Sequence, residues 1–206
     1  MVAAENGDLN RVREQLEKGV DVNARAQAGH TALMLAAAAG HLEVVKTLLN
    51  AKADPNIRVI TFHAGESLTL MAAMNRCNKD WEKILDAMIA AGGELNPKEV
   101  FSNSPLMYAI TRYDPILVKA LIAKGADVNL KNHRGTTPLM TAIMSRGATV
   151  ENVKLLLGAG ADANARDNDG KTAQAYVDIY VKEKTERAEL SRLLRNGRKQ
   201  KAQMNF

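Results

Sequence analysis

The side chains best suited to chemistry in this chain are one cysteine and four histidines, and their spacing decides whether they could act together. Cys77 could be a nucleophile only beside a base and a group that orients that base. The histidines are scattered and do not have the spacing of metal ligands on one helix: His30, His41, His63 and His133. The sequence has no phosphate-binding glycine loop and no paired-carboxylate motif. We therefore predict no catalytic residues, no metal site and no cofactor, and we do not expect an enzyme.

An asparagine that recurs at the end of one short phrase is the most informative feature of the sequence. The phrase is typified by Gly125-Ala-Asp-Val-Asn129, and its asparagines are Asn23, Asn56, Asn96, Asn129 and Asn164. The intervals between them are 33, 40, 33 and 35 residues. A period in this range is typical of stacked repeats. Because short Asp and Asn side chains bond to nearby backbone, we interpret the asparagines as turn residues.

A second phrase predicts where the helices of each repeat begin and end. A hydroxyl residue precedes an apolar helical run in four places, as expected of N-caps: Thr31, Ser104, Thr137 and Thr172. Pro105 and Pro138 follow two of these caps, at the first helical position. Glycines stand where a left-handed residue can end the second helix: Gly19, Gly125 and Gly160.

These phrases resemble the ankyrin repeat family, in which each repeat pairs a β-turn finger with two antiparallel helices. The stretch Gly40-His-Leu-Glu-Val-Val-Lys-Thr-Leu-Leu49 is similar to the second helix of that family. The resemblance implies an all-α repeat solenoid of about six repeats, including degenerate terminal caps. The phrasing looks most like that of bacterial members.

The periodicity sets the predicted domain organisation. We expect one ankyrin repeat domain over residues 1–197, followed by a basic, disordered tail over residues 198–206. The predicted repeats span residues 1–25, 26–58, 59–98, 99–131, 132–166 and 167–197. No apolar run is long enough to span a membrane.

The third repeat departs most from the family pattern, because it carries insertions around 59–66 and 75–80. Insertions in a repeat array map to exposed loops, often on the binding face. Trp81, the single tryptophan, follows the second insertion. It could contact a partner, or it could cover the apolar layer between the third and fourth repeats. A second departure is methionine in place of the family's histidine at Met34, Met107 and Met140, which suggests weaker bonding between repeats.

Positive charge is concentrated at the end of the chain. Residues 182–206 contain eight basic and three acidic side chains, which account for the whole net charge of +5. We favour a polar cap for the last repeat, with Leu190, Leu193 and Leu194 facing inward. The alternative is a surface that binds nucleic acid or an anionic membrane, although no aromatic residue lies among the arginines to stack on bases.

The start of the chain bears on its location. The first repeat lacks the beginning of its first helix. We expect a cytoplasmic protein from the sequence as written. A periplasmic or secreted location would follow if Met1 is not the native start and a leader has been removed.

The resemblance implies that fingers and first helices form a concave surface that binds another protein. Family surface positions of the fifth repeat correspond to His133, Arg134, Thr136, Met144 and Ser145. The full set of predicted partner-binding residues is His63, Glu66, Met74, Asn75, Trp81, Phe101, Asn103, Thr111, Arg112, His133, Arg134, Met144 and Tyr180. We therefore predict a monomeric, non-enzymatic protein-interaction module. The alternatives are the basic-end binder described above and a regulatory fragment of a larger protein.

Overall fold

The computed structural model describes residues 1–26, 29–61, 65–68, 79–97, 103–145 and 149–204. The chain divides into two compact units, Met1–Leu95 and Asn96–Phe206. We call them the N-terminal and C-terminal units. The division lies close to the predicted boundary between the third and fourth repeats. The single domain over residues 1–197 stays a prediction.

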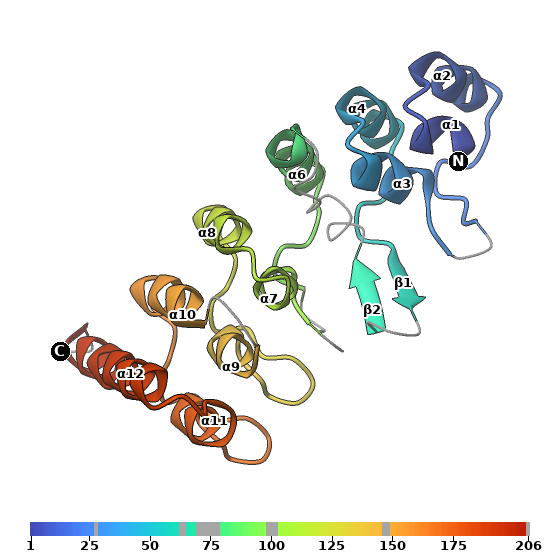
Figure 1. Ribbon diagram of the computed structural model, residues 1–206. Coiled ribbons are helices and arrows are strands. Elements are labelled where there is room, and N and C mark those ends of the chain that lie inside the picture. The colour runs from blue at the N-terminus through green and yellow to red at the C-terminus, as the bar shows by residue number, and fades with distance from the viewer. Residues whose placement is uncertain (27–28, 62–64, 69–78, 98–102, 146–148, 205–206) are drawn as a thin grey trace. The chain divides into compact units, whose positions relative to one another are not determined.

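The N-terminal unit contains helices in two layers and one β-hairpin (Figure 1). Its elements are α1 (Val2–Glu5), α2 (Leu9–Glu17), α3 (Ala32–Ala39), α4 (Leu42–Asn50), β1 (Arg58–Thr61), β2 (Gly65–Leu68) and α6 (Trp81–Ala90). Helix α1 packs against α3 in one layer, while α4 packs against both α2 and α6 in the other. Strands β1 and β2 are antiparallel, with Arg58 opposite Leu68. The first insertion predicted in the third repeat therefore forms a hairpin finger.

The C-terminal unit repeats the two-layer arrangement (Figure 1). Its helices are α7 (Pro105–Thr111), α8 (Pro115–Ala123), α9 (Pro138–Met144), α10 (Thr149–Gly158), α11 (Ala173–Tyr180) and α12 (Lys184–Met204). The first helices α7, α9 and α11 pack in sequence, and so do the second helices α8, α10 and α12. Fingers precede α9 and α11. The fold is thus the helical repeat architecture that the sequence predicts.

The four predicted N-caps begin first helices as expected. The hydroxyl oxygens of Thr31, Ser104 and Thr137 accept hydrogen bonds from the backbone N–H three residues later, at 3.2–3.3 Å. Thr172 does the same at 3.5 Å. Pro105 and Pro138 are the first residues of α7 and α9. The caps satisfy N–H groups that would otherwise be unpaired at the buried start of each helix.

Four of the five recurring asparagines bond to the repeat that follows them, a role not predicted from the sequence. Asn129 Oδ1 accepts from the N–H of Asp162 at 2.7 Å, and its Nδ2 donates to the carbonyl of Gly160 at 3.2 Å. Asn56 and Asn96 make the same two bonds to the repeat that follows each of them. The local turn bond comes from the aspartate instead, as where Asp127 accepts from the N–H of Asn129. Our interpretation of the asparagines as turn residues therefore assigned them the wrong bonds.

The methionines that replace the family's histidine are core residues. Met34, Met107 and Met140 are at most 4% exposed. Met140 Sδ also accepts a weak hydrogen bond from the backbone N–H of Thr137 at 3.5 Å. Polar bonds between repeats come from other side chains, including the recurring asparagines and Lys131.

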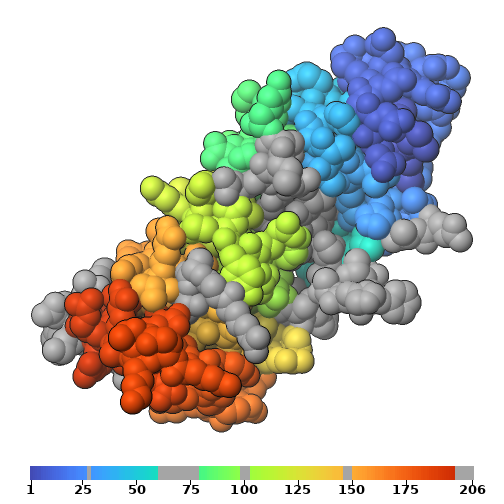
Figure 2. All heavy atoms as spheres, in the orientation of Figure 1, coloured from blue at the N-terminus to red at the C-terminus, as the bar shows by residue number. Residues whose placement is uncertain are grey.

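Helix α12 covers the last face of the C-terminal unit and is longer than we expect. Leu190 and Leu194 are fully buried, and Leu193 is half-buried. Arg187 donates from Nη2 to the carbonyl of Asp178 at 2.9 Å and from Nε to that of Val181 at 3.0 Å, at the end of α11. Figure 2 shows the red atoms of α12 beside the orange atoms of α11. The helix continues to Met204, beyond the predicted end of the last repeat at residue 197.

Candidate functional site

The finger of the fifth repeat holds two exposed side chains on a fixed loop. Asn132 Oδ1 accepts hydrogen bonds from the backbone N–H groups of Arg134 and Thr136, at 3.0 and 3.1 Å. Gly135 has a φ of 71°, a left-handed conformation that glycine adopts without strain. The loop therefore presents His133 and Arg134 to solvent.

The first helices α7 and α9 supply the other side of the site through their C-terminal ends. Thr111, the last residue of α7, is exposed, and its hydroxyl donates to the carbonyl of Tyr108 at 2.8 Å. Met144 ends α9 and is half-buried. Ser145 follows, with its hydroxyl donating to the carbonyl of Thr141 at 2.9 Å. Because the Thr111 hydroxyl donates to a helix carbonyl, its oxygen can still accept a hydrogen bond.

Together the finger and the helix ends surround an open hollow of about 330 Å³ in the C-terminal unit. We call it the finger hollow. Its lining residues are Asn103, Thr111, Asn132, His133, Arg134, Thr136, Thr141, Met144 and Ser145. The structure thus brings together five of the predicted partner-binding residues: Asn103, Thr111, His133, Arg134 and Met144.

Arg112 and Tyr180 are exposed in the same unit but do not line the hollow. Arg112 follows Thr111 directly, and its guanidinium carbon lies 5.7 Å from the centroid of the Tyr108 ring. The Tyr180 ring stacks on that of Tyr176 with centroids 6.0 Å apart. A role for either residue in partner binding stays a prediction.

The other predicted residues belong to the N-terminal unit or lie outside the described residues. Trp81 is half-buried at the start of α6, in the layer of second helices. Glu66 lies in β2, opposite Ile60. The positions that fall outside the described residues are His63, Met74, Asn75 and Phe101.

Two residues of the hollow, Asn132 and Thr141, were not predicted from the sequence. Asn132 stands four residues before Thr136, at the place that Asp167 has before Lys171 in the next finger. Both side chains accept two backbone N–H bonds that close their finger. The recurrence of Asn or Asp at this place in both fingers is the sequence signal that could have identified Asn132.

Asp167 makes a further contact in the sixth repeat, because the Tyr176 hydroxyl donates to its carboxylate. Burial and this bond raise the pKa of Tyr176 to about 12. Burial alone would raise the pKa of Asp167, but hydrogen bonds from Tyr176 and from the N–H groups of Lys171 and Asp169 outweigh it and hold that pKa below its ordinary value. Both groups therefore keep their charge state near neutral pH. The pair stabilises the finger and does not exchange protons there.

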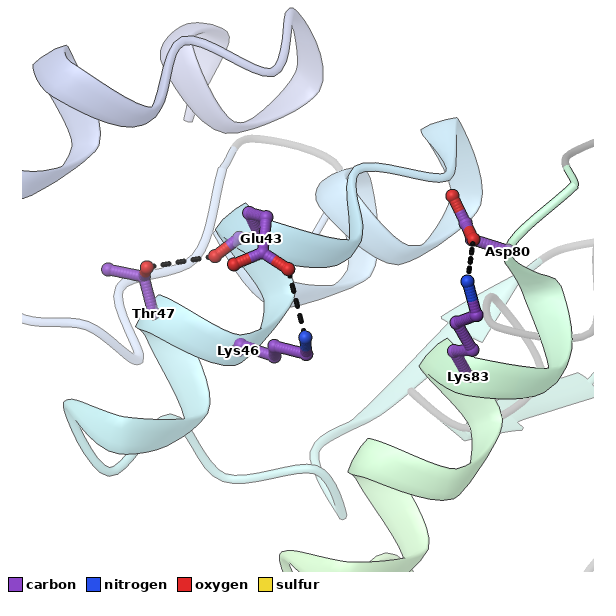
Figure 3. A network of polar contacts seen from close by, with 5 residues as sticks. All are labelled: Glu43, Lys46, Thr47, Asp80 and Lys83. Atoms are coloured by element: carbon purple, nitrogen blue, oxygen red, sulfur yellow. Dashed lines mark hydrogen bonds and ion pairs between the residues drawn. The ribbon is translucent and has the colours of Figure 1, made fainter.

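The N-terminal unit has a larger hollow, of about 530 Å³, in which opposite charges meet. Its lining includes Glu43, Asp80 and Lys83. Lys83 Nζ lies 2.9 Å from Asp80 Oδ1, and Lys46 Nζ lies 2.9 Å from Glu43 Oε1. Figure 3 shows both pairs. The bond from Lys83 is the main reason that the pKa of Asp80 is lowered. These charges are satisfied within the protein itself.

Neither a metal centre nor a membrane span was found in the part of the chain that the structure describes. No group of three or more His, Cys, Asp and Glu side chains there could hold a metal ion. No helix there is long and apolar enough to cross a membrane.

Comparison with protein families and solved structures shows which known proteins this chain resembles. The family model for ankyrin repeats in three copies matches residues 1–96 and 69–167. An ankyrin repeat domain from Acinetobacter baumannii is 28% identical, with a TM-score of 0.75, and the match covers 95% of each chain. A chain from the structure of a predatory endopeptidase from Bdellovibrio bacteriovorus in complex with an immunity protein is 26% identical, with a TM-score of 0.68. That match covers 92% of this chain and 95% of the other.

Two curated mammalian relatives match shorter segments. The inactive serine/threonine-protein kinase TEX14 of Mus musculus is 31% identical over 108 residues, which is 52% of this chain and 7% of the relative. The mitochondrial disaggregase of Bos taurus is 47% identical over 57 residues, which is 28% of this chain and 8% of the relative. The chain therefore spans less than a tenth of these relatives.

Proposed function

Since this chain belongs to the ankyrin repeat family, whose model matches it from residue 1 to residue 167, we propose that it is a non-enzymatic module that binds a partner protein at the finger hollow. Ankyrin repeats are a general protein-interaction architecture. Stacked repeats suit this role because their fingers and first helices form extended surfaces. The proposed function includes no catalytic activity.

The observation that carries this proposal is the convergence of the predicted residues on one hollow. Asn103, Thr111, His133, Arg134 and Met144 come from two repeats and line one concave site. The site combines an arginine, a methionine and several hydrogen-bonding groups. Arginine and methionine are enriched in protein interfaces. The resemblance to a chain from an endopeptidase–immunity protein complex supports a protein as the partner.

The proposal can be tested by filling the hollow without changing its charge. Thr111→Trp adds bulk at an exposed hollow position, and Ala123→Trp adds the same bulk at an exposed position of α8, in the layer of second helices. We expect affinity capture from a lysate of the source organism to recover a protein with the wild type and with Ala123→Trp, but not with Thr111→Trp. Circular dichroism checks that all three are folded. Equal recovery by both variants would contradict binding at the hollow.

The same capture tests the basic end of the chain. Arg192 and Arg195 are exposed on α12, and replacing both with alanine removes charge without shortening the helix. If the recovered material is nucleic acid and is lost only with these replacements, the function belongs to α12.

A further inference from the structure

We propose that the finger hollow receives an acidic chain segment of the partner and that Arg134 binds one of its carboxylates. This inference rests on the proposed function, and it adds the chemistry of the partner. It follows from the charges in the hollow, from the way the finger holds Arg134, and from the absence of a partner for the Arg134 side chain among the described residues.

The charge of the lining has one sign. Among the lining residues that the structure describes, Arg134 and His133 are the ionisable side chains, and none is Asp or Glu. The other lining residues are neutral amides, hydroxyl residues and Met144. A concave site lined by one sign of charge attracts a partner of the opposite sign.

Arg134 extends from a backbone that is already fixed. Its carbonyl accepts from the N–H of Asn168 at 3.1 Å, and the carbonyl of His133 accepts from Asn168 Nδ2 at 2.9 Å. A Cβ on Gly135 would lie 2.5 Å from Asn168 Oδ1, so the finger of the fifth repeat fits tightly against that of the sixth. Binding through Arg134 would therefore order one side chain and not a loop, which limits the entropic cost.

The Arg134 side chain has no hydrogen bond or ion pair with any described residue. Three lysines of the C-terminal unit show the contrast, because each has a partner within the protein. Lys171 pairs with Asp169 at 2.8 Å and Lys154 pairs with Glu189 at 2.9 Å. Lys131 Nζ donates to the carbonyl of Arg166 at 2.8 Å. Arg134 is therefore available to a carboxylate from outside the chain.

Arg112 adds a second positive charge beside the lining residue Thr111. Its guanidinium lies over the Tyr108 ring, and Nη1 is 3.4 Å from Tyr108 Oη. A cation on an aromatic face keeps its full charge, and the ring limits the orientations of the guanidinium. Arg112 therefore reinforces the positive potential next to the hollow.

The hollow also indicates which acidic segment fits. A guanidinium can bind a carboxylate through two parallel hydrogen bonds, an arrangement that a neutral amide cannot match in strength. The half-buried Met144 offers an adaptable apolar contact within the same lining. We therefore expect a segment in which Asp or Glu stands next to an apolar residue.

Blocked pentapeptides provide the test. The probes are acetylated, amidated Gly-Glu-Leu-Glu-Gly and its counterparts with Gln or Lys in place of Glu. They are titrated into the full-length, isotope-labelled protein at low ionic strength, and affinity is measured from backbone amide chemical shifts. We expect the Glu peptide to bind at least about fivefold more tightly than the Gln peptide, because an ionised acceptor strengthens the bond. The shifts should include residues of the finger hollow.

Three variants locate the effect. Arg134→Ala should weaken binding of the Glu peptide about fivefold. Arg192→Ala, which removes the same charge from an exposed position on α12, should change it less than about twofold. Arg134→Glu should reverse the preference, so that the Lys peptide binds more tightly than the Glu peptide.

Several results would overturn the inference: no measurable binding of the Glu peptide, equal binding of the Glu and Gln peptides, or equal losses in Arg134→Ala and Arg192→Ala. The proposed function is judged separately by Thr111→Trp. Partner capture that is lost in Thr111→Trp but unchanged in Arg134→Ala would leave the hollow as the binding site and overturn its preference for acid.

Discussion

The second and fifth repeats share one plan but differ at one buried position of the second helix. Val44 in α4 and Asn152 in α10 each stand two residues before a lysine, and each is 1% exposed. Val44 is apolar, as a core position requires. Both the amide nitrogen and the amide oxygen of Asn152 are buried without a hydrogen-bond partner.

At this position, the repeat that contributes most to the finger hollow carries an energetic cost that the second repeat does not. A buried, unpaired amide costs about 1–3 kcal/mol. An array can carry such a cost in one repeat, because its stability sums contributions from every repeat and every interface. Four experiments test this comparison, from the largest expected effect to the smallest.

Val44→Asn should reproduce in the second repeat the defect of the fifth. We expect a loss of about 3 kcal/mol in the free energy of unfolding, because apolar burial is lost and an unpaired amide is buried. Urea unfolding of the full chain measures the loss. Lys46→Asn, on the exposed face of the same helix, should cost less than about 1 kcal/mol. Equal losses of unfolding free energy in the two variants would show that burial of the substituted position does not determine the cost.

Asn152→Val should repair the fifth repeat. We expect a gain of about 2 kcal/mol, since the unpaired amide is replaced by an apolar side chain of similar size. The urea midpoint should rise, while partner capture should stay unchanged because Asn152 does not line the finger hollow. An unchanged midpoint would indicate that water satisfies the amide in solution.

The asparagines that precede the two repeats should differ in their contribution. Asn129 makes two hydrogen bonds to the end of the fifth repeat, to Asp162 and to Gly160. For Asn23 the structure gives one bond to the end of the second repeat, to the N–H of Asp54 at 2.8 Å. At about 1 kcal/mol for each bond, Asn129→Ala should cost about 2 kcal/mol and Asn23→Ala about 1 kcal/mol. Thermal unfolding of both variants tests this order, and a larger loss for Asn23→Ala would reverse it.

The residues that end the two second helices should respond in opposite directions. Lys52 has a φ of 67° in the second repeat, and Gly160 has a φ of 90° in the fifth. A left-handed conformation costs a residue with a Cβ about 1 kcal/mol, so Lys52→Gly should gain about that much. Gly160→Ala should lose a similar amount through the backbone alone, because its Cβ would meet no atom within 4 Å. Unfolding midpoints that move in the same direction would contradict this account.

The sequence by itself determined the repeat architecture, because its signals are local. Hydroxyl caps, first-turn prolines and glycines with positive φ act on backbone groups a few residues away, so Thr137, Pro138 and Gly160 can be interpreted without knowing the fold. The family's surface positions likewise selected seven of the residues that line the finger hollow. Burial of Leu190 and Leu194 followed from helical periodicity.

Only the tertiary structure decided which distant groups meet. The bonds of Asn129 extend to residues 31 and 33 positions away, and no local rule separates them from a turn bond. Asn132 and Thr141 line the hollow because a finger packs beside the end of a helix, which spacing alone does not show. The free charge of Arg134 and the unpaired amide of Asn152 depend on what lies around each side chain after folding, and therefore on packing between repeats.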